Sequence, residues 1–144
     1  MATKSETYIT RSIIKYIKKV GGDAFHVHGS MFQRNGEPDI SGDMPYGKTY
    51  LKLKLEVKTP KGKPTKIQIE RLKSYHTRGY VAGIVSSTSD LIELIYVYSR
   101  FYEFGQNLEP FSALYTETTG KPDYGIYDKS TNAITYGLND RLLL

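Results

Sequence analysis

The sequence contains no cysteine and no long apolar run. Without cysteine, the chain has no disulfides, no thiolate zinc site and no cysteine nucleophile. Its most apolar stretch, Leu91–Tyr98, is short and is interrupted by Glu93, so it falls far below the length of a membrane span. The N-terminus also lacks the apolar core of a secretory signal. We therefore expect a soluble protein without membrane contacts, located inside a bacterial, archaeal or phage-infected cell.

The chain has 144 residues and a mass of 16.4 kDa, which predicts one domain over residues 1–144. A formal net charge of +5 and a pI near 9.2 predict a surface that attracts polyanions, most commonly nucleic acid. Residues 44–80 hold ten Lys or Arg against two acids, whereas residues 99–144 hold four against six. The positive charge is thus concentrated in one segment, although runs of lysine are also common on surfaces that only face water.

Hydrophobic periodicity and turn residues predict alternating helices and strands. The predicted elements are a helix over about 4–20, strands over 24–28 and from residue 39, a strand over 50–58, a helix over 65–77, a strand over 80–86 and a helix over 87–99. Beyond residue 100 the pattern weakens, but segments 124–128 and 133–137 predict a β-hairpin. This order predicts an α/β sandwich in which helices flank a central mixed β-sheet, followed by a C-terminal hairpin extension over about 99–144.

Three polar residues stand out at the ends of two predicted strands. In the strand over 50–58, apolar and charged residues alternate, so Glu56 and Lys58 lie on the same face. If the strand that begins at Asp39 is its neighbour, two carboxylates converge beside one ammonium group. Such carboxylates form a hard oxygen site suited to Mg²⁺ or Mn²⁺, and a nearby lysine can orient a water or stabilise a phosphate. The spacing predicts chemistry on a phosphodiester.

The same residues resemble the PD-(D/E)XK nuclease superfamily, and within it VRR-NUC domains and, more distantly, archaeal-type Holliday-junction resolvases. The matching features are Gly36-Glu37-Pro38-Asp39, then Glu56-Val57-Lys58, then the exit Lys58-Thr-Pro-Lys-Gly62 and the helix start Thr65-Lys-Ile-Gln68. The resemblance covers about residues 4–98 and leaves the last third unexplained. It implies a restriction-endonuclease-like sandwich for the fold.

Carried over position by position, the resemblance implies that Asp39 and Glu56 bind the metal through their carboxylates. The Val57 carbonyl would be a further ligand, and Lys58 would be the catalytic lysine. The implied products carry a 5′-phosphate and a 3′-hydroxyl. Taken alone, a Glu-x-Lys pattern is common on any exposed strand and a Pro-Asp pair is an ordinary turn signal, so the prediction rests on their combination.

Two more residues have a functional and a structural interpretation. The resemblance implies that Gln68 assists near the water or phosphate, but it could also be an exposed helix residue. It likewise implies that Glu6 reaches the site directly or through a metal-bound water. Glu6 is also the fourth residue of Thr3-Lys4-Ser5-Glu6, a capping-box sequence in which the glutamate would bond back to the helix start.

Histidines and a second aspartate near these residues offer weaker candidates. His26 and His28 alternate along a predicted strand, which could indicate a metal pair or a phosphate contact. Partly buried strand histidines are the commoner case, and we favour that interpretation. Asp43 follows Gly42 and lacks a preceding proline, so we do not assign it to the metal site.

DNA, double-stranded or branched, is the predicted partner, and a few basic residues are predicted to contact its phosphates. Among the thirteen tyrosines, only Tyr46 and Tyr50 lie beside the lysines in a way that suggests stacking on bases. The resemblance implies a homodimer, and the acidic, tyrosine-rich tail from Ser99 is interpreted as its interface or as a substrate cap. The predicted phosphate contacts are Arg34, Lys61, Lys63 and Lys66.

These observations predict a Mg²⁺- or Mn²⁺-dependent DNA endonuclease that recognises structure or backbone more than base sequence. Such an enzyme would serve DNA repair, recombination or phage DNA metabolism. A restriction-type enzyme or an exonuclease would use the same site on a different substrate. A nucleic-acid-binding module with an unused site, or a purely structural domain with an incidental basic face, are the alternatives outside that class.

Overall fold

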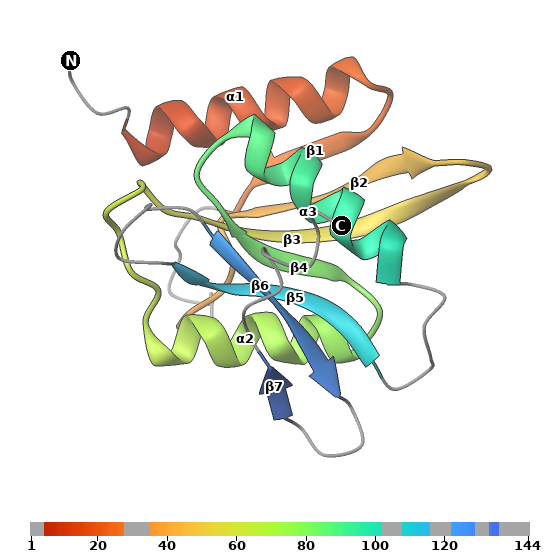
Figure 1. Cartoon of the computed structure of the whole chain (residues 1–144). Coiled ribbons are helices and arrows are strands. Elements are labelled where there is room, and N and C mark those ends of the chain that lie inside the picture. Colours follow the sequence, from red (N-terminus) through yellow and green to blue (C-terminus); the bar gives the residue numbers. More distant parts are fainter. Residues whose placement is uncertain (1–4, 28–34, 102–107, 116–121, 129–132, 136–144) are drawn as a thin grey trace.

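The computed structural model describes residues 5–27, 35–101, 108–115, 122–128 and 133–135 of the chain, with side chains described only as far as residue 96. Three helices and seven strands lie within these residues (Figure 1). The helices are α1 (Glu6–Lys19), α2 (Lys66–Thr77) and α3 (Thr88–Phe101). The strands are β1 (Asp23–His26), β2 (Ile40–Tyr46), β3 (Thr49–Val57), β4 (Val81–Val85), β5 (Leu108–Tyr115), β6 (Pro122–Asp128) and β7 (Ala133–Thr135).

All seven strands belong to one mixed sheet in the order of the sequence. β1 and β2, and then β2 and β3, pair antiparallel, and β3 pairs parallel with β4. β5 continues the sheet beside β4, where Gly83 pairs with Ser112, and β6 and β7 follow antiparallel. The strands after residue 100 therefore extend the central sheet. The segment that was expected to be an extension outside the core contributes strands to this sheet.

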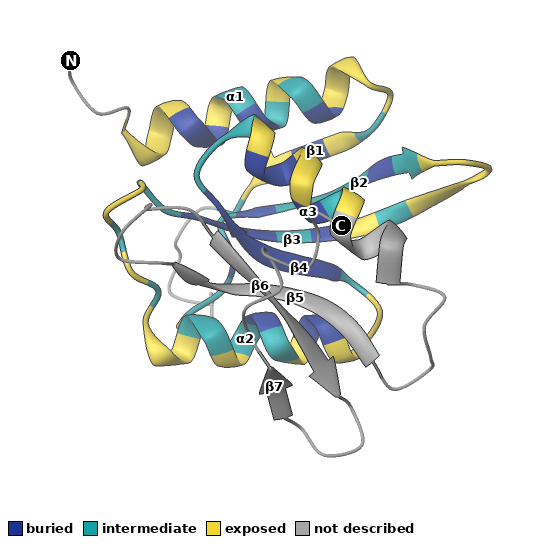
Figure 2. Cartoon of the chain, in the orientation of Figure 1, coloured by how far each residue is buried: buried dark blue, intermediate teal, exposed yellow. Residues whose placement is uncertain are grey.

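The helices cover the two faces of the sheet unequally (Figure 1). α1 and α3 pack on one face, where Ile13, Ile17 and Leu91 join Leu53 and Leu55 in the main core. α2 packs on the other face, where a smaller cluster contains Leu72, Tyr75, Ala82 and Ile84. Figure 2 shows this division as buried stripes on the inner sides of α1 and α2 and a buried β4 between them. The predicted α/β sandwich with a mixed sheet is confirmed.

The first helix begins later than the sequence suggested. Ser5 is its N-cap, and the Ser5 hydroxyl accepts a hydrogen bond from the Tyr8 amide at 3.1 Å. Glu6 is thus the first helical residue, and not the third as a capping box from Thr3 requires. The capping-box interpretation of Glu6 was wrong because Ser5 lies closer to the apolar stripe and caps the helix there.

A capping box does form at the start of α2. Thr65 Oγ1 accepts from the Gln68 amide at 3.2 Å, and Gln68 Oε1 accepts from the Thr65 amide at 2.8 Å. These two bonds satisfy backbone groups that a helix start otherwise leaves to water. The predicted cap at Thr65 is confirmed. The apolar pattern of this helix also predicts that Ile67 faces inward, but Ile67 is 43% exposed, whereas Leu72, Tyr75 and His76 are buried.

The alternation in β3 sorts its side chains as predicted. Leu53, Leu55 and Val57 are buried in the main core under α1 and α3. Lys54 and Glu56 face α2, because Lys54 Nζ lies 4.6 Å from the centre of the Tyr75 ring and Glu56 bonds to Gln68. The residues with candidate chemistry therefore lie on the face covered by α2. Within the described ranges, none of the helices has the length and apolar character needed to cross a membrane.

Candidate active site

The register of β2 and β3 brings Asp39 next to Glu56. Ile40 pairs with Leu55, so the next position of the ladder sets Asp39, just before β2, opposite Glu56 near the end of β3. Both Ile40 and Leu55 are buried in the main core. Because strand side chains alternate, Asp39 and Glu56 both project toward the α2 face. The predicted convergence of these two carboxylates is thus a consequence of the β2–β3 register.

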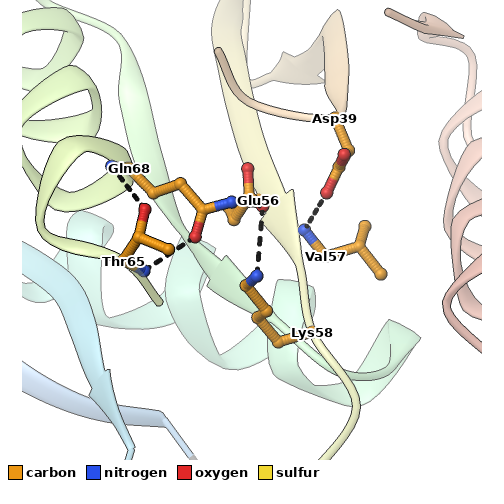
Figure 3. Close-up of polar contacts among 6 residues, drawn as sticks. All are labelled: Asp39, Glu56, Val57, Lys58, Thr65 and Gln68. Atoms are coloured by element: carbon orange, nitrogen blue, oxygen red, sulfur yellow. Dashed lines mark hydrogen bonds and ion pairs between the residues drawn. The ribbon is translucent and has the colours of Figure 1, made fainter. Parts of the chain in front are cut away.

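Glu56 is buried and makes its polar contacts through a single carboxylate oxygen. Oε1 accepts a hydrogen bond from Gln68 Nε2 at 2.8 Å and lies 3.8 Å from Lys58 Nζ. Its side chain is 3% exposed, whereas that of Lys58 is 15% exposed. Figure 3 shows Gln68 and Lys58 reaching Glu56 from α2 and from the end of β3. Oε2 of Glu56 is buried and has no hydrogen-bond partner among the described residues.

This environment changes the protonation of Glu56. The pKa of Glu56 is raised from 4.5 to about 9, mainly by burial and secondly by the negative charge of Asp39. The nearby Lys58 acts in the opposite direction but does not offset the burial. Glu6 adds the smallest of the named repulsions. Without a bound metal ion, Glu56 is therefore favoured in its protonated form at neutral pH.

Asp39 makes a contact that the sequence did not predict. Its Oδ2 accepts a hydrogen bond from the Val57 amide at 2.8 Å (Figure 3). The Asp39 carbonyl also accepts from the Val27 amide at 2.7 Å, which fixes its backbone against the end of β1. Val57 lies between Glu56 and Lys58 in the sequence, so its hydrogen bond holds the Asp39 carboxylate close to both residues. No sequence signal distinguishes this side chain-to-backbone bond from an ordinary turn aspartate.

The segment before Asp39 is held by α2. Arg71 Nε donates to the Asn35 carbonyl at 3.1 Å, and the Tyr75 hydroxyl donates to Glu37 Oε2 at 2.6 Å. Between them, Gly36 has a φ of +79° and approaches the helix so closely that a Cβ there would lie 3.0 Å from the Ile67 backbone. Only glycine combines this backbone conformation with this approach at low cost. The helix that supplies Gln68 therefore also positions Asp39.

Gln68 has its side-chain amide engaged at both ends. Oε1 accepts from the Thr65 amide in the capping box, and Nε2 donates to Glu56. The capping box fixes the side chain, and the side chain in turn fixes the carboxylate. Gln68 thus contacts Glu56 directly, and its two hydrogen bonds indicate that it positions the Glu56 side chain.

Other predicted site residues lie farther out or outside the described part of the chain. Glu6 is exposed at the start of α1 and its charge acts on Glu56 only weakly. Lys61, Lys63 and Lys66 are exposed in the segment between β3 and the first turn of α2. His26, which was expected to be partly buried, is exposed in β1, and the candidates Arg34 and His28 fall outside the described residues.

The donor set can be compared with what a divalent cation requires. Within the described ranges, no group of three or more His, Asp or Glu side chains gathers closely enough to hold a metal ion. Asp39 and Glu56 supply two carboxylates, which is the number that Mg²⁺ commonly takes from a protein while keeping several waters. Among the described residues, the buried Glu56 Oε2 has no hydrogen-bond partner, and burial together with the neighbouring charge of Asp39 raises the pKa of Glu56. These residues fit a hard divalent cation.

No protein-family model matches the chain, and no curated protein matches it. Among solved structures, the chain is similar to Hjc, a Holliday junction resolvase from the archaeal hyperthermophile Archaeoglobus fulgidus. The identity is 16%, the TM-score is 0.37, and the match covers 86% of this chain and 77% of that one. A likeness of this size does not establish a family, so the VRR-NUC and PD-(D/E)XK resemblances stay predictions.

Proposed function

We propose that this chain is a divalent-metal-dependent DNA endonuclease whose active site consists of Asp39, Glu56 and Lys58. One observation carries the proposal. At the end of β3, two carboxylates and a lysine converge, and one oxygen of the buried Glu56 has no hydrogen-bond partner among the described residues. Burying a carboxyl group in this way is costly unless a ligand or cation offsets it. A purely structural domain gains nothing from that arrangement.

Mg²⁺ or Mn²⁺ is the proposed cofactor, because both prefer oxygen ligands. Asp39 and Glu56 would hold it, and the Val57 carbonyl is proposed as a further ligand. When bound, the cation supplies positive charge that offsets the charge building on the reacting phosphate and that promotes deprotonation of the attacking water. The same positive charge would lower the pKa of Glu56, so that Glu56 would lose its proton when the cation binds.

The chain's own residues have separate tasks in this proposal. Lys58 projects its ammonium group beside Glu56 and is accessible enough to donate to a phosphate oxygen or to the attacking water. Gln68 holds Glu56 in place through its Nε2. The exposed Lys61, Lys63 and Lys66 follow the active site along the chain and would bind neighbouring phosphates. Because such contacts release counterions, binding should weaken steeply with salt.

The proposed substrate is double-stranded or branched DNA, cut with selectivity for structure or weak selectivity for sequence. The proposal includes one restriction-endonuclease-like nuclease domain over residues 1–144, an intracellular location and a homodimer. Roles in DNA repair, recombination or phage DNA metabolism are consistent with such an activity. An exonuclease or restriction-type enzyme would use the same residues on other DNA.

A substrate panel tests this function. The protein is incubated with supercoiled plasmid, single-stranded, flapped and four-way-junction DNA, each with Mg²⁺, with Mn²⁺ and with EDTA. We expect cutting in the presence of either metal and none in EDTA. Binding to DNA without cutting any of these substrates would replace the enzyme with a binding module. Cutting that begins only at DNA ends would make it an exonuclease.

A further inference from the structure

A cavity lies at the far end of β3 from the candidate active site. It has a volume of about 400 Å³ and is lined by Tyr46, Tyr50, Leu51, Lys52, Arg78 and Gly79, among others. This volume is within the range of small-molecule and cofactor sites. None of the residues assigned to catalysis lines it, so it requires a separate explanation.

The cavity results from the different lengths of two paired strands. β3 begins at Thr49, whereas β4 begins at Val81, which pairs with Leu53. The first residues of β3 therefore extend past the start of β4. α2 ends at Thr77, and the turn at Arg78 and Gly79 then faces this overhanging part of β3. The cavity lies between the overhang and the turn.

Its lining combines aromatic rings with positive charge. Tyr46 is 39% exposed and Tyr50 is 59% exposed, and both border the cavity. Lys52 and Arg78 supply two cations, and no acidic side chain is among the described residues that line it. Exposed aromatic faces bind nucleobases by stacking, and Lys and Arg bind phosphates. This combination fits a nucleotide better than an apolar or a cationic ligand.

The two cations are held by neighbouring rings. The guanidinium of Arg78 lies 4.7 Å from the centre of the Tyr75 ring, and its Nε donates to the Ser74 carbonyl at 3.3 Å. Lys52 Nζ lies 6.0 Å from the centre of the Tyr80 ring. A cation that is already positioned loses less conformational entropy when it binds a phosphate. The cavity is therefore organised before any ligand arrives.

The cavity lies too far from Glu56 to hold the phosphate that is cut. Tyr50 and Glu56 share one strand, and at about 3.4 Å per residue their separation is roughly 20 Å. That distance corresponds to about six base-pair steps of B-form DNA. A nucleotide in the cavity would belong to the same DNA, several nucleotides from the reacting bond.

We propose that this cavity binds an unpaired nucleotide of the DNA substrate. The proposal rests on the nuclease function above and specifies its substrate class. Inside a continuous duplex, both faces of each base are covered by its neighbours, so stacking on Tyr46 or Tyr50 requires a base that has left the duplex. The cavity therefore selects DNA with a single-stranded segment near the cut over uninterrupted duplex.

Binding in EDTA tests this proposal without any cleavage. Fluorescence anisotropy compares a blunt duplex with the same duplex carrying a single-stranded overhang of about ten nucleotides, longer than the roughly six steps to the active site. The proteins are the unmodified chain, Tyr50→Ala and Tyr50→Phe. Tyr96→Ala is the matched control, because Tyr96 is an exposed tyrosine of α3, on the opposite face of the sheet.

We expect Tyr50→Ala to weaken binding of the overhang DNA by about 5- to 150-fold, the range of one lost base–aromatic stack. Blunt-duplex binding should change less than about twofold, since ordinary surface substitutions have small effects. Tyr50→Phe, which keeps the ring, and Tyr96→Ala should bind both DNAs like the unmodified protein. Equal binding of overhang DNA by Tyr50→Ala, or an equal loss on both DNAs, overturns the proposal.

Cleavage assays with Mn²⁺ on the same DNAs separate this proposal from the proposed function. If no DNA is cut but Tyr50→Ala still loses overhang binding, the nucleotide site stands and the nuclease function fails. If the unmodified protein cuts and Tyr50→Ala binds and cuts overhang DNA equally well, the nuclease stands and the nucleotide site fails.

Discussion

Gln68 donates a hydrogen bond from Nε2 to Glu56 Oε1 at 2.8 Å while its Oε1 accepts from the Thr65 amide. The carbonyl end of this side chain thus completes the cap of α2, and its amide end holds the buried carboxylate of Glu56. The cap and the candidate active site are consequently linked through a single residue. Substitutions at the two ends of this link should separate stability from activity.

Gln68→Ala removes the bond to Glu56 and half of the capping box, whereas Thr65→Ala removes only the hydroxyl of the cap. Both variants should lose about 0.5–2 kcal/mol of unfolding free energy, the usual cost of a lost cap. Only Gln68→Ala should also lose about 10- to 100-fold in metal affinity or cleavage, as is typical when a ligand's supporting partner is removed. Urea unfolding and single-turnover cleavage measure the two effects. An equal loss of cleavage in both variants would assign Gln68 to the helix cap alone.

The raised pKa of Glu56 predicts a stability that depends on pH. The pKa is about 9 in the folded chain and near 4.5 when unperturbed, so the folded state keeps a proton that the unfolded state releases between these values. The stabilisation from this proton is complete below pH 4.5 and is lost as the pH rises toward about 9. The loss is at most about 1.4 kcal/mol per pH unit.

Glu56→Gln removes this titration and keeps an oxygen that accepts from Gln68. In EDTA, the variant should melt at a higher temperature than the unmodified protein at pH 8, and the difference should shrink toward pH 5. Thermal denaturation across this range measures it. A difference between the two proteins that stays constant from pH 5 to pH 9 would show that Glu56 titrates normally.

Gly36 is expected to be essential for placing Asp39. Gly36→Ala imposes a side chain at a φ of +79° and brings its Cβ to 3.0 Å from the Ile67 backbone. Gly47 is a matched control, because its φ is +59° but nothing lies within 4 Å of an added Cβ. Gly47→Ala should cost only about 1–2 kcal/mol for the left-handed backbone. Gly36→Ala should lower the free energy of unfolding by more than this, and it should also reduce cleavage of blunt duplex DNA. Similar stability and cleavage in the two variants would contradict the role of Gly36 in placing Asp39.

Much of the framework followed from sequence because local signals and packing agreed. Alternation in β3 placed Leu53 and Leu55 on one face and Glu56 on the other, and the run over 80–86 predicted the strand that the structure shows as β4. The hydroxyl of Thr65 predicted the start of α2, although the part of Gln68 in the capping box was not predicted. These features depend on neighbours along the chain, and a single sequence contains that information.

Other features depended on contacts between distant residues. The bond from Tyr75 to Glu37 and the one from Val57 to Asp39 join segments whose approach only the β2–β3 register and the position of α2 determine. At the first helix, the sequence predicted a capping box from Thr3, whereas Ser5 caps the helix and the helix begins at Glu6. After residue 100 the periodicity was too weak to show that the strands join the central sheet.

The most direct test of the active site is single-turnover cleavage of one DNA with Mn²⁺ by four proteins: the unmodified chain, Lys58→Ala, Glu56→Gln and Lys18→Ala. Lys18 is an exposed lysine of α1 and controls for the loss of one positive charge. We expect Lys58→Ala and Glu56→Gln to cut at least about 100-fold more slowly, the usual cost of removing a group that stabilises developing charge. Lys18→Ala should cut at the unmodified rate. Cleavage by Lys58→Ala and Glu56→Gln at that same rate would contradict the assignment of the site.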